Sequence, residues 1–149
     1  MHTKKITAIA LSFCFFVFSL PAVTCLAYSG GDGLSESTAF QIANTADLME
    51  LAGDTPNYDK YFILTADIDL SSSGTFSTAV IAPDTPDTTS GFDGVPFTGR
   101  FDGAGHTINN LTIDTVGAGN DYLGLFGRID STGEIKNLIL TKCQHHRRR

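Results

Sequence analysis

Short apolar runs separated by glycine and polar residues occupy most of the chain. Phe40–Ile42 and Asp67–Leu70 alternate between apolar and polar residues, and Lys60–Leu64 is a run of β-forming residues. In Asp67–Leu70 the isoleucine and leucine share one face and both aspartates share the other, which is the pattern of a half-buried strand. These runs predict a protein built mainly from short β-strands.

One segment has helical periodicity instead. Leu48 and Leu51 fall on one helical face, with Asn44 or Thr45 placed to cap the N-terminus and Gly53 placed to end the helix. A helix of about two turns is unstable on its own. We therefore expect it to cover the apolar end of a stack of strands.

One pattern occurs twice in the second half of the chain. Gly99–Gly105 and Ile108–Ile113 resemble Gly127–Gly133 and Ile135–Leu140, and the second copy is shorter by a single position. Similarity at a period of this size, about 28 residues, is typical of stacked units that each bury an apolar face against the next. The repeat predicts a β-solenoid.

Each copy contains a predicted corner. The apolar residues on either side of Asn109 and Asn110 have opposite parity, so the chain must turn there to bury all of them. Asn137 occupies the matching place in the second copy. Asparagine tolerates the left-handed backbone of a sharp corner. We expect Asn110 and Asn137 to stack, with their amides forming a ladder.

Residues 1–27 have the pattern of a secretory signal peptide. Lys4 and Lys5 precede the uncharged apolar run Ile6–Leu20, and small residues at Cys25 and Ala27 fit cleavage after Ala27. The run is short for a membrane span. We expect a secreted or cell-surface protein with no membrane span after processing; a lipoprotein cleaved at Cys25 is the alternative.

The processed chain divides into three parts. An opening segment and capping helix occupy 28–59, and the strand units occupy 60–142 with a loop excursion at about 83–94. The basic tail 143–149 fits no preceding pattern. A truncated, frameshifted or fused gene product explains this tail, and a basic anchoring tail is the alternative.

Charge and cysteine content restrict the classes of function. Removing the predicted signal peptide leaves all 16 acidic side chains but takes away Lys4 and Lys5, so the net charge becomes more negative than −6 and lies near −8. Such a chain repels nucleic acid. Only Cys143 then remains, so an internal disulfide is excluded and packing and backbone pairing must hold the fold.

The best acidic pair is Asp67 and Asp69. Two carboxylates on one face are candidates for calcium ligands or acid–base groups. However, an exposed strand face before a turn explains both, and no aspartate-rich nonapeptide repeat surrounds them. Calcium is the only cofactor that the sequence suggests.

Other candidates have simpler explanations. Asp102 and His106 are a candidate catalytic pair, but Asp102 belongs to an Asp-Gly turn and no nucleophile motif accompanies them.

Cys143 is a candidate nucleophile or crosslinking thiol, yet it lies alone beside the tail. His145 and His146 are adjacent and so do not share a face of an extended chain. Asn110 begins a glycosylation sequon, which an internal position would leave inaccessible.

Two segments carry a resemblance to known proteins. Phe97–Ile108 resembles the F-x-G-x-F-D-G-x-G-H-x-I segment of secreted parallel β-helix proteins. The residues Gly124, Leu125, Phe126 and Gly127 match the GLUG motif (Gly-Leu-any-Gly) of bacterial surface repeat proteins. The order of elements from Tyr28 to Leu70 is similar to the usual opening of those proteins.

The resemblance implies an all-β fold, a right-handed parallel β-helix, with a structural role for the Gly-Leu-Phe-Gly motif. The corner pattern independently gives structural roles to Asn110 and Asn137. It brings no catalytic motif. We expect a non-enzymatic secreted or cell-surface module for display or adhesion, the N-terminal fragment of a longer repeat protein. A polysaccharide or another cell-surface ligand is the expected partner. The edge of the last unit, Ile135–Leu140, has nothing stacked on it, so we also expect self-association.

Two alternatives remain open. The chain is the N-terminal piece of a polysaccharide-active β-helix enzyme, or it is a gene remnant without a function of its own.

Overall fold

A computed structural model describes residues 28–116 and 121–146. The predicted signal peptide lies outside the described residues.

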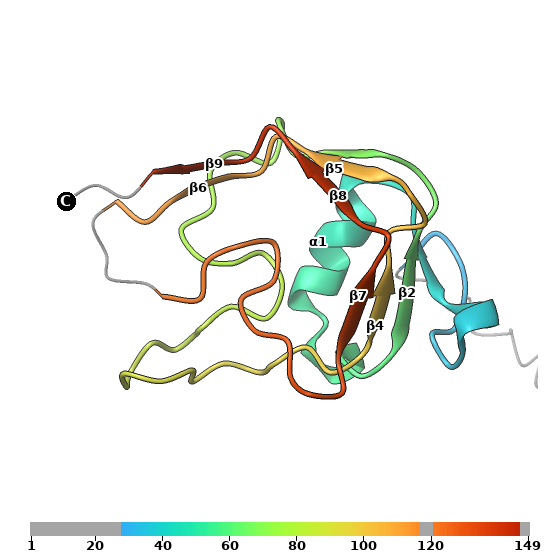
Figure 1. Ribbon diagram of the computed structural model, residues 1–149, viewed down its shortest axis with the longest axis horizontal. Coiled ribbons are helices and arrows are strands. Elements are labelled where there is room, and N and C mark those ends of the chain that lie inside the picture. The colour runs from blue at the N-terminus through green and yellow to red at the C-terminus, as the bar shows by residue number, and fades with distance from the viewer. Residues whose placement is uncertain (1–27, 117–120, 147–149) are drawn as a thin grey trace, which may run out of the picture.

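The described residues form three small sheets in which every strand pair is parallel (Figure 1). The first sheet has the order β1 (Phe40–Ile42), β2 (Tyr61–Leu64), β4 (Arg100–Asp102) and β7 (Glu134–Lys136). The second has the order β3 (Ile68–Asp69), β5 (Thr107–Asn109) and β8 (Ile139–Thr141). The third pairs β6 (Thr112–Asp114) with β9 (Gln144–His146). The strands predicted at residues 40–42, 60–64 and 67–70 are confirmed.

The predicted helix is also confirmed. Helix α1 spans Thr45–Gly53, and the Asn44 side chain accepts a hydrogen bond from the Asp47 N–H at 3.0 Å, as an N-cap does. Leu48 and Leu51 are fully buried. Two short 3₁₀ turns, η1 (Glu36–Thr38) and η2 (Thr55–Asn57), complete the helical elements of the described chain. None of these helices is long and apolar enough to cross a membrane.

The parallel register aligns apolar side chains from strand to strand. Phe62 of β2 pairs with Phe101 of β4, which pairs with Ile135 of β7. Phe126 packs against Phe97 and Phe101, with ring centroids 5.2 and 5.5 Å apart. Burying one such side chain stabilises a fold by about 1.5–3 kcal/mol. These side chains form or pack against one core that also contains residues of α1 and of the second and third sheets.

The expectation of a right-handed parallel β-helix is wrong. The described residues form three separate small sheets with one α-helix, and no closed or solenoid sheet runs through them. The reason is the brevity and uneven number of the strands: each is short, and the three sheets contain four, three and two strands. Residues 70–99 contribute isolated bridges and no extended strand.

The pairing register also differs from the sequence repeat. Arg100 pairs with Glu134 in the structure, whereas the repeat aligns it with Arg128. Paired residues are therefore further apart in the sequence than the period of the repeat. Thr107 and its partner Ile139 show the same longer separation. The repeat aligns the corner between β5 and β6 with the corner between β7 and β8, which belong to different sheets. Two strand–asparagine–strand corners look alike in sequence because each solves the same local problem.

Part of the segment predicted to be an unrelated tail belongs to the third sheet. Gln144–His146, placed with the anomalous tail, form β9 and pair with Thr112–Asp114. Backbone hydrogen bonds make this pairing, so it does not require apolar side chains.

The loop excursion folds around its own carboxylate. Asp93 accepts hydrogen bonds from the Thr89 hydroxyl at 2.8 Å and from the N–H groups of Thr88 and Thr89, both at 2.7 Å. The hydroxyl of Thr89 and the donors of Thr88 lower the pKa of Asp93 to about 2. Asp84, which is buried, accepts the Asp93 N–H at 2.6 Å. All of these bonds lie within the loop, so they fix its internal conformation.

The Gly-Leu-Phe-Gly segment packs tightly against the chain that precedes the loop. Leu125 is buried, and the Ile81 N–H donates to its carbonyl oxygen at 2.8 Å. A Cβ atom on Gly127 would lie 2.3 Å from the Ala82 carbonyl oxygen. Only glycine allows the two backbones to approach so closely.

We therefore predict that Gly127→Ala destabilises the protein by about 1–3 kcal/mol, because the added methyl group forces the backbones apart. Gly53→Ala is the matched control, since nothing lies within 4 Å of a Cβ at that position. It should change the free energy of unfolding by less than about 1 kcal/mol. Urea denaturation measures both, and equal effects would contradict the close approach.

Candidate functional site

The carboxylate of Asp67 supports the backbone of the neighbouring strand. Its Oδ1 accepts the Thr107 N–H at 2.8 Å and lies 3.4 Å from the Nδ1 of His106. The Thr107 N–H is the main cause that lowers the pKa of Asp67. His106 therefore contacts Asp67, which precedes β3, and not Asp102, its partner in the candidate catalytic pair that the sequence disfavours.

The carboxylate of Asp69 holds a corner of the chain. Its Oδ1 accepts the Asn110 Nδ2–H at 2.7 Å and the Ser71 N–H at 2.9 Å. Asn110 has φ 60°, the left-handed conformation expected for it. Its amide is the main cause that lowers the pKa of Asp69.

Asp102 and Asn137 repeat this arrangement in the first sheet. The Asn137 Nδ2–H donates to Asp102 Oδ1 at 3.0 Å, and Asn137 has φ 52°. Desolvation by itself would raise the pKa of Asp102, but Asn137, the Ala104 N–H and Lys136 outweigh it and lower that pKa. In both cases the asparagine lies immediately after the strand partner of the aspartate. We call Asp69–Asn110 and Asp102–Asn137 the corner pairs.

The expected ladder of Asn110 on Asn137 is wrong. Asn109 pairs with Thr141, so Lys142 rather than Asn137 follows the strand partner of Asn109, and Lys142 shares its left-handed backbone at φ 51°. Asn137 lies beside Gly105 instead, whose N–H donates to the Asn137 carbonyl at 3.0 Å. Each amide binds a carboxylate of the preceding strand and not another amide.

These contacts bear on the predicted calcium ligands. The Oδ1 atoms of Asp67 and Asp69 already accept hydrogen bonds from different parts of the neighbouring strand. Within residues 28–116 and 121–146, no three His, Cys, Asp or Glu side chains gather where they would hold a metal ion. Calcium binding stays a prediction from the sequence.

Charged side chains alternate across the exposed face of the first sheet. Arg100 of β4 forms an ion pair with Glu134 of β7. Lys136 of β7 forms one with Glu36 of η1 and approaches Asp102 at 3.5 Å. Exposed pairs of this kind add about 0–1 kcal/mol each. The strand register sets this arrangement, in which positive and negative side chains alternate between β4 and β7.

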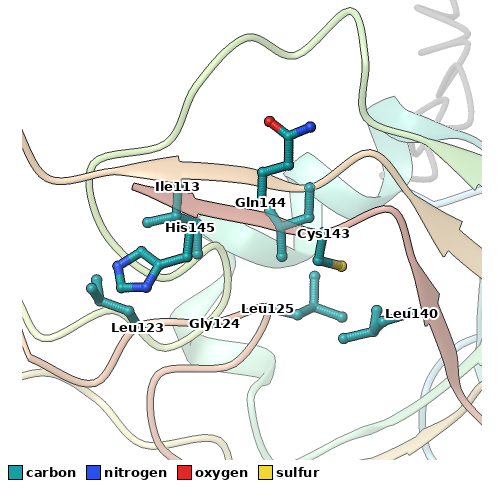
Figure 2. Close-up of a pocket in the computed structure, with 9 residues that line it drawn as sticks. Ile113, Leu123, Gly124, Leu125, Leu140, Cys143, Gln144 and His145 are labelled. Carbon is teal, nitrogen blue, oxygen red and sulfur yellow. The ribbon is translucent and has the colours of Figure 1, made fainter. Parts of the chain in front are cut away.

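A cavity of about 270 Å³ lies where the second and third sheets meet the Gly-Leu-Phe-Gly segment. Its lining is mostly aliphatic: Leu111, Ile113, Leu123, Gly124, Leu125, Leu140, Cys143, Gln144 and His145. Figure 2 shows the Cys143 sulfur and the His145 ring directed towards the leucine side chains, while Gln144 points away.

Sequence reasoning missed this cavity because it treated Cys143–Arg149 as unrelated to the strands. The register makes Ile113 the partner of His145. Leu-Thr-Ile at 111–113 and Cys-Gln-His at 143–145 share the order of inward, outward and inward side chains. Aligning these two triplets was the signal available in the sequence.

Comparison with known proteins gives one relative. A 110-residue stretch, 74% of this chain, is 38% identical to halomucin of Haloquadratum walsbyi (strain DSM 16790 / HBSQ001). The chain spans about 1% of the length of that relative. No family model matches the chain, and no solved structure matches it.

The Asn110 corner pair leads to a prediction about stability. Asn110→Ala removes the hydrogen bond to Asp69 and also forces alanine, which has no polar side chain, into the left-handed backbone at φ 60°. The variant should therefore lower the free energy of unfolding by about 1–3 kcal/mol. Asn110→Gly loses the same bond but relieves the backbone, so its cost should be smaller. Urea midpoints compare the two variants, and an equal loss would show that the left-handed backbone contributes nothing.

The lowered pKa values of Asp67, Asp69 and Asp102 predict acid sensitivity. Each carboxylate is more acidic in the folded state, so its contribution is complete above the unfolded pKa of about 3.9 and is lost as the pH falls through the folded pKa. The free energy of unfolding should stay level from pH 7 to 5 and decrease below about pH 4. Asp69→Asn should flatten this decrease, whereas Asp87→Asn, in an exposed part of the loop, should not. An unchanged slope in Asp69→Asn would contradict the assignment.

Proposed function

We propose that this chain is a non-enzymatic module of an exported surface protein and serves display or adhesion. The observation that carries the proposal is the use of its carboxylates. Asp67, Asp69 and Asp102, the acidic residues with the most chemical promise in the sequence, all accept hydrogen bonds that join neighbouring strands or corners. Carboxylates held in this way support the fold, and this use of the acidic residues favours a structural role for them.

The similarity to part of halomucin supports a surface role. The resemblance of Gly124–Gly127 to the Gly-Leu-any-Gly motif of bacterial surface repeat proteins supports the same class of protein. The pattern of residues 1–27 supports export with Tyr28 as the first residue of the processed chain.

A polysaccharide or another cell-surface ligand is the partner we propose. Single exposed sites on a small module bind weakly, and repetition of modules in a longer protein raises the effective affinity without new contacts. The net negative charge opposes nucleic acid as a partner.

Two measurements test this proposal. Intact cells that express the chain are treated with protease, and the released peptides are identified by mass spectrometry. We expect the released peptides to include one that begins at Tyr28. We also expect the amount of this protein that remains on the cells to fall after treatment. The exported protein is also incubated with pectic, mannan and chitin-type polysaccharides and with casein, with and without calcium, and we expect no turnover.

Two outcomes would overturn the proposal. Retention of an intact Met1 inside the cell would exclude a surface role. Turnover that disappears in the Asp67→Asn/Asp69→Asn double variant would make the chain an enzyme, because that variant removes both charges while keeping the size of the side chains.

A further inference from the structure

The three sheets end at one common edge. Strands β7, β8 and β9 follow one another in the chain and are each the last strand of their sheet in the described structure. They form the continuous dark-red path in Figure 1. We call these three strands the terminal edge.

The terminal edge presents hydrogen-bonding groups outward. The Glu134 N–H donates to Gly99 at 2.9 Å, and the Lys136 carbonyl accepts from Gly103 at 2.8 Å, so both residues face β4. Successive residues in a strand face opposite sides, and the N–H and C=O of Ile135 therefore point away from the sheet. The N–H and C=O groups of Leu140 in β8 and of His145 in β9 point outward by the same alternation. The residues next to them in the chain are hydrogen-bonded to the β5 and β6 segments.

The opposite edges are covered. Gln41 of β1 exchanges hydrogen bonds with Ser29 and Gly30, at 3.1 and 2.8 Å. The Thr45 hydroxyl donates to the Asp69 carbonyl of β3 at 3.0 Å. Phe76 bridges to Ile113 of β6. The edges at β1, β3 and β6 thus already carry contacts, whereas the terminal edge has outward-facing backbone groups that an added strand could bind.

The charges on the first sheet favour a particular partner for this edge. If a second β7 lies antiparallel, with the two Ile135 residues opposite each other, Glu134 of one copy faces Lys136 of the other. The order across the junction is then Arg100, Glu134, Lys136 of the second copy and Asp102 of the second copy, so the alternation of charge continues. A shift by two positions places like charges opposite each other, which is unfavourable.

The backbone geometry fits the same arrangement. Two Ile135 residues opposite each other, with outward N–H and C=O groups, form the closely spaced antiparallel pair in which each residue donates and accepts one bond. The aliphatic cavity adjoins this edge, because Leu140 and His145 belong to both. Ile139 and Leu140 are 46% and 44% exposed, so a second copy would also cover apolar surface.

We propose that the terminal edge docks a second copy of this chain, antiparallel and related by a twofold axis through Ile135. Because a twofold interface uses the same edge of both copies, the assembly closes at two copies.

A charge exchange tests the proposal. Sedimentation velocity should show a concentration-dependent dimer for the exported protein. Glu134→Lys alone and Lys136→Glu alone each place like charges across the junction, and each should weaken the dimer by at least about tenfold. In an equal mixture, the two lysines of the first variant face the two glutamates of the second, and a heterodimer should form. Glu50→Lys, an exposed helix position with the same charge change as the first variant, should dimerise as the unaltered protein does.

Three results would overturn the proposal. The unaltered protein could sediment as a monomer at about 100 µM, either single variant could dimerise as the unaltered protein does, or the mixture of the two variants could stay monomeric. Circular dichroism verifies that the variants fold. A second readout needs no charge change: Cys143 lines the cavity and is exposed, so its labelling rate should fall as the concentration of unaltered protein rises. A constant labelling rate would also contradict the dimer.

Discussion

Parallel backbone pairing in a single register is the constraint on which the rest of this molecule depends. It places Phe62, Phe101 and Ile135 one above another, and the same alignment brings Arg100 to Glu134 and Asp102 to Lys136. The core and the charged face therefore share one cause. A register slip by a single position would exchange them, sending apolar side chains to solvent and charges inward.

The corners show how the chain changes direction without a long loop. Asn110 and Asn137 adopt a left-handed backbone, and each is held by an aspartate from the preceding strand. The aspartate supplies an acceptor at the place where ladder hydrogen bonding stops. The carboxylates of these two aspartates therefore stabilise the corners of the fold, in addition to contributing to the net negative charge of the protein.

Local features of this molecule were predictable from the sequence, whereas pairings were not. The helix with its Asn44 cap and the left-handed asparagines follow from a few neighbouring residues, and each is present. The register is not predictable because two different corners have similar sequences, and the repeat does not reveal that the sheets remain small and separate. The candidate site has the same limit. Asp67 and Asp69 are recognisable as an exposed pair, but their partners Thr107 and Asn110 lie far along the chain, beyond any local pattern.

The long separations between paired strands also have a kinetic meaning. Phe40 must find Phe62, Phe62 must find Phe101, and Phe101 must find Ile135. Each pairing closes a long loop before any contact compensates the lost entropy, and folds dominated by such contacts form slowly. Each strand of the first sheet thus depends on a partner that lies more than 20 residues away, so no local segment can build this sheet by itself.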